Sequence, residues 1–499
     1  MRQLANASMQ RHVIIIGGGP AGLTAALELS KHNVPAMVLE ADKQVGGIAR
    51  TVNYKGYLFD IGGHRFFTKW DEVNQIWNEV LGDKFLERPR LSRIYYKKKF
   101  FVYPLVAKNA LFGLGLFESI RIMASYAKAK LMPTAKEENL EEWVSNRFGR
   151  RLYEIFFKTY TEKVWGVPCT TIRAEWAAQR IKGLSLLTAV RNALFPGKNS
   201  NVKTLIDRFQ YPERGPGQMW ETLTDQLNAS GYPVLMERPV VRICHERAKV
   251  TRLVTQGPNG TEQYSGTDFI SSMPIRELVR ALDPAPPQKI LDAANKLRYR
   301  DFLIISLVVN RKDVAPDSWI YVHEPGVKVG RIQNFKNWSP AMVPDASKTC
   351  LGMEYFVFEN DELWSSSDEK LLELARREIV ELGLVRPEEI EDGTVVRMQK
   401  AYPMYDEDWA AQVDTIRGYL GENMPNLQLV GRNGMHKYNN QDHSMITALY
   451  AARNICGANY DLWAVNTEAD YHEERKENVS WNSRQFAAIE RAGTEAGGI

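Results

Sequence analysis

The chain contains few cysteines for its length. Cys169, Cys244, Cys350 and Cys456 are the only four among 499 residues, and no two of them form a Cys-x-x-Cys pair. This spacing argues against a disulfide framework and against a zinc site, so we expect no bound metal. The usage is typical of a protein kept in a reducing compartment, and we expect a cytoplasmic location.

An excess of charge of either sign is also missing. The 64 basic residues nearly balance the 60 acidic ones, which leaves a formal net charge of +4, and no long basic stripe is present. A nucleic-acid partner usually requires such a stripe, so none is expected.

No hydrophobic run is long enough to span a bilayer. The N-terminal residues 1–12 have no apolar signal core, and the apolar stretch Ala110 to Leu116 is soon followed by Glu118 and Arg121. The wider region from Leu105 to Leu131 is interpreted as helix packed in a second domain, with no membrane contact expected.

The most informative segment runs from Arg11 to Glu40. Val13 to Ile16 has the β-branched density of a buried parallel strand, and Gly17-x-Gly19-x-x-Gly22 follows it without a gap. A helical pattern and a second apolar run, Ala36 to Leu39, then lead to Glu40. Strand, glycine loop, helix, strand and acid in this order predict a dinucleotide-binding βαβ unit.

Each residue of this loop has a physical role. Gly17 permits the tight turn, Gly19 lets the backbone approach a pyrophosphate, and Gly22 allows the helix to pack against the strand. Pro20 and Ala21 open the helix, whose N-terminus would hold the pyrophosphate. Glu40, followed by Ala41, is placed to bind the ribose hydroxyls.

Two further glycine pairs distinguish the cofactor. Gly46-Gly47 and Gly62-Gly63, the second followed by His64, are not usual in NAD domains. Together with the βαβ unit they resemble the FAD superfamily of amine oxidases, protoporphyrinogen oxidases, carotenoid desaturases and UDP-galactopyranose mutases. We therefore expect FAD.

The dinucleotide-domain signals stop and return along the chain. The fold expected is α/β, with a discontinuous Rossmann-like FAD-binding domain made of residues 11–100, 203–300 and 400–470. Helical spacing in residues 101–202 predicts an inserted helical domain, and alternating segments in 301–399 predict an antiparallel-sheet substrate layer. Residues 471–499 are interpreted as a polar C-terminal tail.

Within this plan, smaller elements can be assigned. Strands are expected at Tyr232 to Glu246, with the adenine near Val241, at Asp268 to Pro274 and at Leu427 to Gly431. Helices are expected at 138–148, 181–194 and Ser444 to Ile455.

Most of residues 11–460 resembles UDP-galactopyranose mutase, particularly its long eukaryotic-type branch. The resemblance depends on Gly62 to Phe67, Tyr160 to Pro168, Phe209 to Pro212 and, most specifically, Gly431-Arg432-Asn433-Gly434 with Tyr438 and Asn440 to Ser444. It implies two diphosphate-binding arginines, Arg331 and Arg432.

The resemblance also implies the other site residues. His64 beside the flavin completes the catalytic set with the two arginines. The implied substrate-binding residues are Tyr103, Tyr160, Trp165, Tyr321, Tyr402, Tyr438 and Asn440. The expected FAD-binding residues are Gly17, Gly19, Pro20, Ala21, Gly22, Glu40, Ala41, Gly47, Gly62, Gly63, His64, Val241, Gly431, Gln441, Asp442, Ser444 and Met445.

Two single residues and one turn depart from the family pattern. Val106 stands where the family has glutamine, Thr161 stands where it has asparagine, and the turn Gly215 to Trp220 is closer to the oxidases and desaturases. The first two lie on the nucleotide side, so the resemblance implies diphosphate recognition more strongly than uridine recognition.

The implied activity is interconversion of the pyranose and furanose rings of a nucleotide-diphosphate sugar. In that mechanism FAD is reduced and its N5 attacks the anomeric carbon as the nucleoside diphosphate leaves, without net redox change. A helix N-terminus at Asp442 to Met445 would stabilise the anionic reduced flavin. An external reductant, NADPH or a reductase, is expected because no second dinucleotide motif is present.

The alternative is an FAD-dependent oxidoreductase of the amine oxidase, protoporphyrinogen oxidase or desaturase type. The fold alone does not separate the two activities. Two pocket arginines favour a diphosphate substrate, because an apolar or cationic substrate would leave them unpaired. The oligomeric state, the sugar and the base are left open by the sequence.

Overall fold

The structure is a computed structural model that describes residues 11–466 except 104, 106, 175–207 and 407. The helix expected at 181–194, the tail from Tyr471 and the departure at Val106 lie outside the described residues.

The predicted βαβ unit is confirmed. β1 (Val13–Ile16) and β2 (Ala36–Leu39) are parallel neighbours joined by α1 (Pro20–Lys31). They belong to a five-stranded parallel sheet in the order β20-β13-β1-β2-β9, completed by β13 (Asp268–Ser271), β20 (Leu427–Leu429) and β9 (Val234–Leu235). All four residues of β1 are buried, as expected for a strand covered on both faces.

The predicted strand region Tyr232 to Glu246 divides between two sheets. β9 joins the parallel sheet, whereas β10 (Val240–Glu246) belongs to a four-stranded sheet in the order β12-β11-β10-β14. The other strands of that sheet are β11 (Lys249–Gly257), β12 (Gly260–Ser265) and β14 (Leu282–Asp283).

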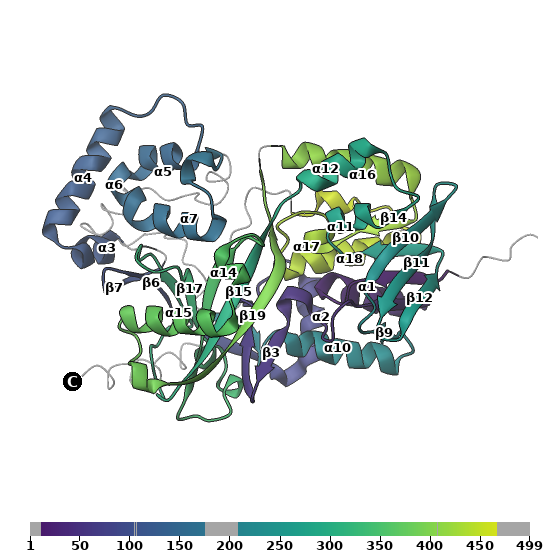
Figure 1. The fold of residues 1–499 in the computed structure, drawn as a ribbon, viewed down its shortest axis with the longest axis horizontal. Helices are drawn as coiled ribbons and strands as arrows, with labels where there is room; N and C mark the ends of the chain where they lie inside the picture. Colours follow the sequence, from purple (N-terminus) through teal and green to yellow (C-terminus); the bar gives the residue numbers. More distant parts are fainter. Residues whose placement is uncertain (1–10, 104, 106, 175–207, 407, 467–499) are drawn as a thin grey trace, which may run out of the picture.

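A seven-stranded sheet lies to the left of α1 and β9 in the view of Figure 1. Its order is β19-β15-β18-β17-β16-β6-β7, and every neighbouring pair is antiparallel except β16 with β6. The strands are β6 (Ser92–Tyr96), β7 (Lys99–Val102), β15 (Tyr299–Val309), β16 (Trp319–Val322), β17 (Arg331–Asn334), β18 (Thr349–Val357) and β19 (Ile390–Pro403). The sheet thus recruits the β6–β7 hairpin from the N-terminal part of the chain. Helix α15 (Asp368–Glu381) covers one of its faces (Figure 1).

Helices dominate the region between β7 and residue 174. They are α3 (Ala107–Leu114), α4 (Leu116–Leu131), α5 (Leu140–Phe148), α6 (Arg150–Tyr153) and α7 (Thr159–Trp165), with a π-helical turn at Glu154–Lys158. Asn139 caps α5 by accepting from Glu142 N–H at 3.0 Å, while the Glu142 carboxylate accepts from Asn139 N–H. Among the described residues, no helix combines the length and hydropathy needed to cross a bilayer.

The remaining elements connect these layers. They are β3 (Thr51–Tyr54), β4 (Tyr57–Asp60), α2 (Asp71–Leu81), β5 (Phe85–Pro89), β8 (Arg208–Pro212), α10 (Gly217–Ala229), α11 (Ile275–Arg280), α12 (Gln288–Lys296), α13 (Phe335–Trp338), α14 (Glu362–Ser365), α16 (Trp409–Asn423), α17 (Gly431–Gly434) and α18 (Gln441–Ile455). Helix α18 begins three residues before the predicted Ser444, because Asn440 caps it.

Candidate active site

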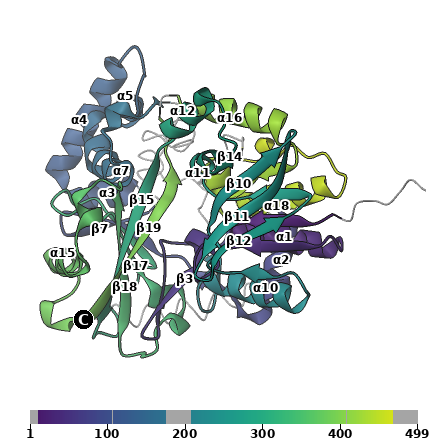
Figure 2. The same cartoon turned by 45° about the vertical axis from the view of Figure 1, so that its right-hand side comes forward.

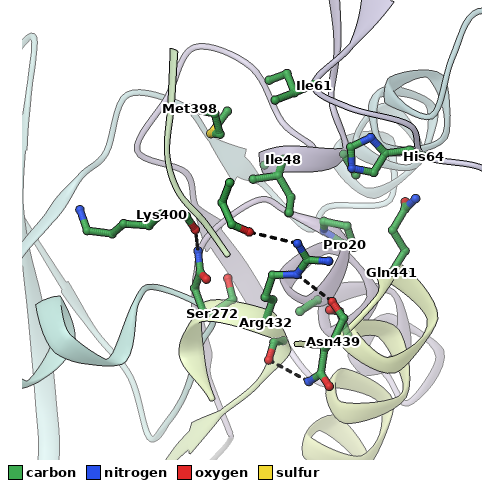
Figure 3. Close-up of a pocket in the computed structure, with 18 of the residues that line it drawn as sticks. Pro20, Ile48, Ile61, His64, Ser272, Met398, Lys400, Arg432, Asn439 and Gln441 are labelled. Atoms are coloured by element: carbon green, nitrogen blue, oxygen red, sulfur yellow. Dashed lines mark hydrogen bonds between the residues drawn. The ribbon is translucent and has the colours of Figure 1, made fainter. Parts of the chain in front are cut away.

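A cavity of about 640 Å³ extends from the glycine loop after β1 to the seven-stranded sheet. The segments that line it come from the β1–α1 loop, the Gly62 to Phe67 loop, β17, the end of β19 and residues 431–444. Figure 3 shows side chains from these separate segments converging on one space. Its volume is in the range of cofactor and ligand sites.

The glycine loop has the close packing that its spacing predicts. Gly17 has φ of +100°, and a Cβ at Gly22 would lie 1.8 Å from the Gly17 carbonyl oxygen. Gly19 faces Gly47, whose Cα would be 3.9 Å from a Cβ added at Gly19. Helix α1 begins at Pro20 without a side-chain cap, so its first N–H groups are available to a diphosphate.

Glu40 lies at the end of β2 beside this loop. Its carboxylate accepts from Gly18 N–H at 2.6 Å and from Asp42 N–H at 2.8 Å. Burial raises the pKa of Glu40, and these two bonds oppose that rise. The side chain is therefore fixed at the cavity wall, next to Ala41, where a ribose would bind.

The structure corrects the prediction for Val241. Its side chain is 50% exposed, whereas Val240 lines the cavity with Arg238 and Pro239. The pairing of β10 with β11 shifts register between Val240 and Arg242, and such an irregularity interrupts the alternation of side chains that a regular strand would have.

The Gly62-Gly63-His64 turn forms another part of the cavity wall. A Cβ on Gly63 would lie 3.1 Å from Gln333 Nε2 and 3.3 Å from the Trp338 ring. Burial first and the nearby Arg432 second lower the pKa of His64 to about 4. His64 is thus neutral near pH 7. Its Nδ1–H donates to Gly62 O at 3.1 Å, which leaves Nε2 as an acceptor.

Arg331 projects from β17 and is braced by a carboxylate that the sequence analysis missed. Residue Glu354 is directly opposite on β18, fully buried, and accepts from Arg331 Nε. Gln333 Nε2 donates to the second oxygen of the same carboxylate at 2.7 Å. Burial is the largest influence on Arg331 and opposes its charge, but Glu354 together with Tyr160, Tyr402 and Tyr321 more than offsets it, so the pKa of Arg331 lies above its ordinary value. The only sequence signal for Glu354 was an acid within the apolar run Leu351 to Phe358.

Arg432 is held by the backbone instead. Its Nε donates to Asn439 O at 2.8 Å and its Nη1 to Ala401 O at 3.0 Å, as drawn in Figure 3. The guanidinium carbon lies 4.8 Å from the centre of the Tyr438 ring. These contacts fix the plane of the guanidinium at the cavity wall and do not use Nη2.

The tyrosines form two groups. Tyr402 and Tyr438 are stacked with ring centres 5.7 Å apart, and both line the cavity. Burial raises the pKa of Tyr402 to about 12, so its hydroxyl remains a donor. Tyr321 also lines the cavity and contacts Tyr103 at 4.8 Å and Tyr160 at 5.4 Å, measured between ring centres.

Several predicted residues lie behind the cavity wall. Tyr103, Tyr160 and Trp165 are not among the described residues that line it, although the first two reach it through Tyr321. Met445 is buried and its sulfur accepts from Trp77 Nε1 at 3.2 Å, so it belongs to the core. Gly22 likewise acts by helix packing.

The start of α18 forms the last wall. Asn440, Gln441, Asp442 and Ser444 line the cavity, as does Gly431. Asn440 N–H donates to His443 Nδ1 at 3.2 Å, which makes His443 part of the helix cap. Gln441 Oε1 is buried without a hydrogen-bond partner among the described residues, a feature that fits a bound polar group.

Comparison with known proteins places this site in a family. The description "Flavin containing amine oxidoreductase" matches residues 20–405. The chain belongs to that family. Its members bind FAD, and the uncapped α1 N-terminus, the glycine contacts and the unsatisfied Gln441 oxygen fit that cofactor.

The chain is also similar to individual proteins. A crystal structure of reduced UDP-galactopyranose mutase superposes with a TM-score of 0.79 at 22% identity, over 92% of this chain and 96% of that one. The chain is 27% identical over 164 residues to coproporphyrinogen III oxidase from Bacillus subtilis, which covers 29% of this chain and 34% of that protein. It is 22% identical over 265 residues to 1-hydroxycarotenoid 3,4-desaturase from a Flavobacterium species, covering 49% and 54% respectively.

These likenesses differ in what they support. The chain spans half or less of the length of the first curated relatives it matches. The structural likeness, at 22% identity, shows the fold. Together they identify an FAD-dependent enzyme of the amine oxidase superfamily.

Proposed function

We propose that this protein is a flavin-dependent mutase that interconverts the pyranose and furanose rings of a nucleotide-diphosphate sugar. The observation that supports this most is the pair of arginines, Arg331 and Arg432, that face one cavity from different parts of the chain. Both depress the pKa of His64, which places their charges at the same end of the cavity.

Their environments suit a leaving diphosphate. The Nε of each arginine is already bonded, to Glu354 or to Asn439 O, so each guanidinium is held before substrate arrives. A donor fixed in advance stabilises charge that develops in the transition state without having to reorganise. Bidentate arginine geometry also matches phosphate oxygens better than lysine would.

Other residues would bind and shield the sugar. The stacked Tyr402 and Tyr438 supply a flat wall, Tyr402 supplies a hydroxyl that can donate, and Tyr321 supplies another wall. His64 accepts at Nε2 and cannot donate from that atom while neutral, which suits a hydroxyl of the substrate or cofactor. When bound in reduced form, FAD would supply the nucleophile.

The second candidate is an amine- or polyene-oxidising enzyme. The family and the curated relatives favour it, since they include an oxidase and a desaturase. The charge of Arg432 opposes an amine substrate, because the acceptors that hold it among the described residues are the backbone carbonyls of Asn439 and Ala401 and not a carboxylate. A cationic substrate beside it would be repelled.

The deciding experiment is anaerobic incubation of the holoprotein with nucleotide-sugar pyranoses and furanoses, followed by chromatography. Flavin is left oxidised in one arm, reduced by dithionite in a second and supplied with NADPH in a third. Ring interconversion confined to reduced samples supports the mutase, and activity with NADPH identifies the reductant. Bleaching of oxidised flavin by amines or polyene precursors, without any isomerisation, would contradict it.

A further inference from the structure

Helix α4 has an apolar face that none of the described residues covers. Figure 1 and Figure 2 both show this helix at the outer edge of the helical domain. Four of its large apolar side chains are strongly exposed: Leu116 at 80%, Phe117 at 76%, Ile120 at 58% and Leu131 at 82%. The sequence predicts that this region packs in the helical domain, and in α4 the side that carries Ile122 and Tyr126 does so.

The exposed side chains are ordered on the helix. With about 100° of rotation per residue, the exposed apolar positions fall within an arc of about 120°. These positions are Leu116, Phe117, Ile120, Met123, Ala124, Ala127 and Leu131. Ile122 and Tyr126, on the far side of the helix, are buried in the core of the helical domain. The helix is thus apolar on two faces, of which one packs against other residues in the part of the chain that the structure describes.

Cations border the exposed face on both sides. Arg121 and Lys128 follow one edge of the arc and Lys130 follows the other, and all three are exposed. The one acid of α4, Glu118, points away, with a side chain only 16% exposed and bonded to Arg151. Arg121 lies 3.7 Å from Glu118 at the edge of this pair. An apolar stripe between two basic rims is the pattern of a helix that lies in a membrane interface.

We propose that α4 docks this protein on an anionic phospholipid surface, with the apolar stripe in the interface and the basic rims at the headgroups. The charge of the rims distinguishes between a lipid surface, a second copy of the chain and a segment of the same chain as the partner of the apolar stripe. In a two-fold contact with a second copy, a basic rim would face a basic rim in either orientation of the helices. The chain segment 175–207 also carries more basic than acidic residues, so it would repel the rims. Anionic lipid complements both the stripe and the rims.

The test is co-sedimentation of the flavin-loaded protein with vesicles of phosphatidylcholine alone or mixed with phosphatidylglycerol. Wild type is expected to bind the anionic vesicles, with binding that weakens as salt rises. The double variant Phe117→Ser with Ile120→Ser should bind more than tenfold more weakly. Lys128→Gln with Lys130→Gln should lose roughly tenfold on anionic vesicles only.

A matched control is Tyr460→Ser, which removes a 43% exposed aromatic residue outside the helical domain and should leave binding unchanged. Flavin absorbance in every variant reports that the fold is intact. The proposal is overturned if wild type stays in solution with both vesicle types, or if the α4 variants bind as wild type does. A second copy of the chain would be the occupant instead if the wild-type protein binds no vesicles and forms a dimer in sedimentation equilibrium. The variant Phe117→Ser with Ile120→Ser would then be monomeric.

Discussion

The two ends of the cavity are built by opposite means. At the glycine-loop end, Gly17, Gly19 and Gly47 bring backbone close to the ligand space, Gly22 lets α1 pack against the loop, and Glu40 contributes its side chain. At the opposite end, side chains of β17, β19 and α17 enter the space, and strands or backbone carbonyls hold them. Substitutions that add side-chain volume should therefore disturb the glycine-loop end most. Substitutions that change a charge or a functional group should disturb the opposite end most.

Volume at the glycine-loop end should give the largest effect. Gly22→Ala places a Cβ 1.8 Å from Gly17 O, which neither the strand nor the helix can accommodate without moving apart. We expect the purified variant to lack flavin, measured by its visible absorbance. Gly418→Ala is the matched control, because Gly418 lies in α16 with nothing within 4 Å of the added Cβ. It should keep its flavin and gain up to about 1 kcal/mol in stability. Full flavin content in Gly22→Ala would contradict the packing role.

Charge at the other end should affect stability strongly. Glu354→Gln leaves the Arg331 guanidinium, whose side chain is 20% exposed, without its buried counter-charge, and removal of one partner of such a pair costs up to about 3 kcal/mol. Urea unfolding of the variant measures the loss. The double variant Arg331→Met with Glu354→Gln should recover part of it, because no buried charge remains. Equal losses in the single and double variants would show that the charge pair is not the cause.

Functional-group identity should affect catalysis more than binding. Arg432→Lys keeps the charge but loses the planar donor held by Asn439 O and Ala401 O. We expect kcat to fall by about 10²-fold or more, with a smaller change in KM, if Arg432 stabilises the leaving group. Steady-state kinetics on the substrate identified in the anaerobic incubations provides the comparison. A rise in KM at unchanged kcat would reduce Arg432 to a binding residue.

The pH dependence of stability tests Asp60, a fully buried residue at the end of β4. Its carboxylate accepts from Tyr211 O–H and from Thr51 Oγ1, and burial raises its pKa to about 7. The folded state binds the proton of Asp60 more tightly than the unfolded state does. The stabilising contribution of this group is therefore fully present below about pH 4. Stability is then lost as pH rises toward 7, by about 1.4 kcal/mol per pH unit from this group. Denaturant unfolding between pH 4 and 8 should show a shallower decline for Asp60→Asn, and identical profiles would exclude this assignment.

The glycine-loop end of the cavity could be predicted from the sequence more completely than the opposite end. The β1–α1–β2 unit uses residues within thirty positions of one another, and strand and helix periodicities were enough to predict it. The parallel and antiparallel sheets were predicted for the same reason. The position of Val240 at the cavity was not, because the irregular pairing between Val240 and Arg242 interrupts the alternation of side chains on β10.

Partners distant in sequence were harder to find. Glu354 is 23 residues from Arg331, and only the pairing of β17 with β18 brings them opposite each other. The early start of α18 depends on Asn440 and His443 acting as a cap, a pairing that the apolar pattern does not contain. The exposure of α4 also followed from packing, since its two apolar faces look alike in sequence.

The sequence alone determined the local units of this protein: the dinucleotide loop, the strand and helix classes, and the presence of two arginines in distinctive motifs. These follow from short-range sterics and periodicity, which act between residues near in the chain. Tertiary structure decided which carboxylate neutralises Arg331, which carbonyls hold Arg432, which valine faces the cofactor space and which face of α4 meets solvent. Those outcomes depend on contacts between distant segments, and such contacts exist only once the sheets and helices have packed together.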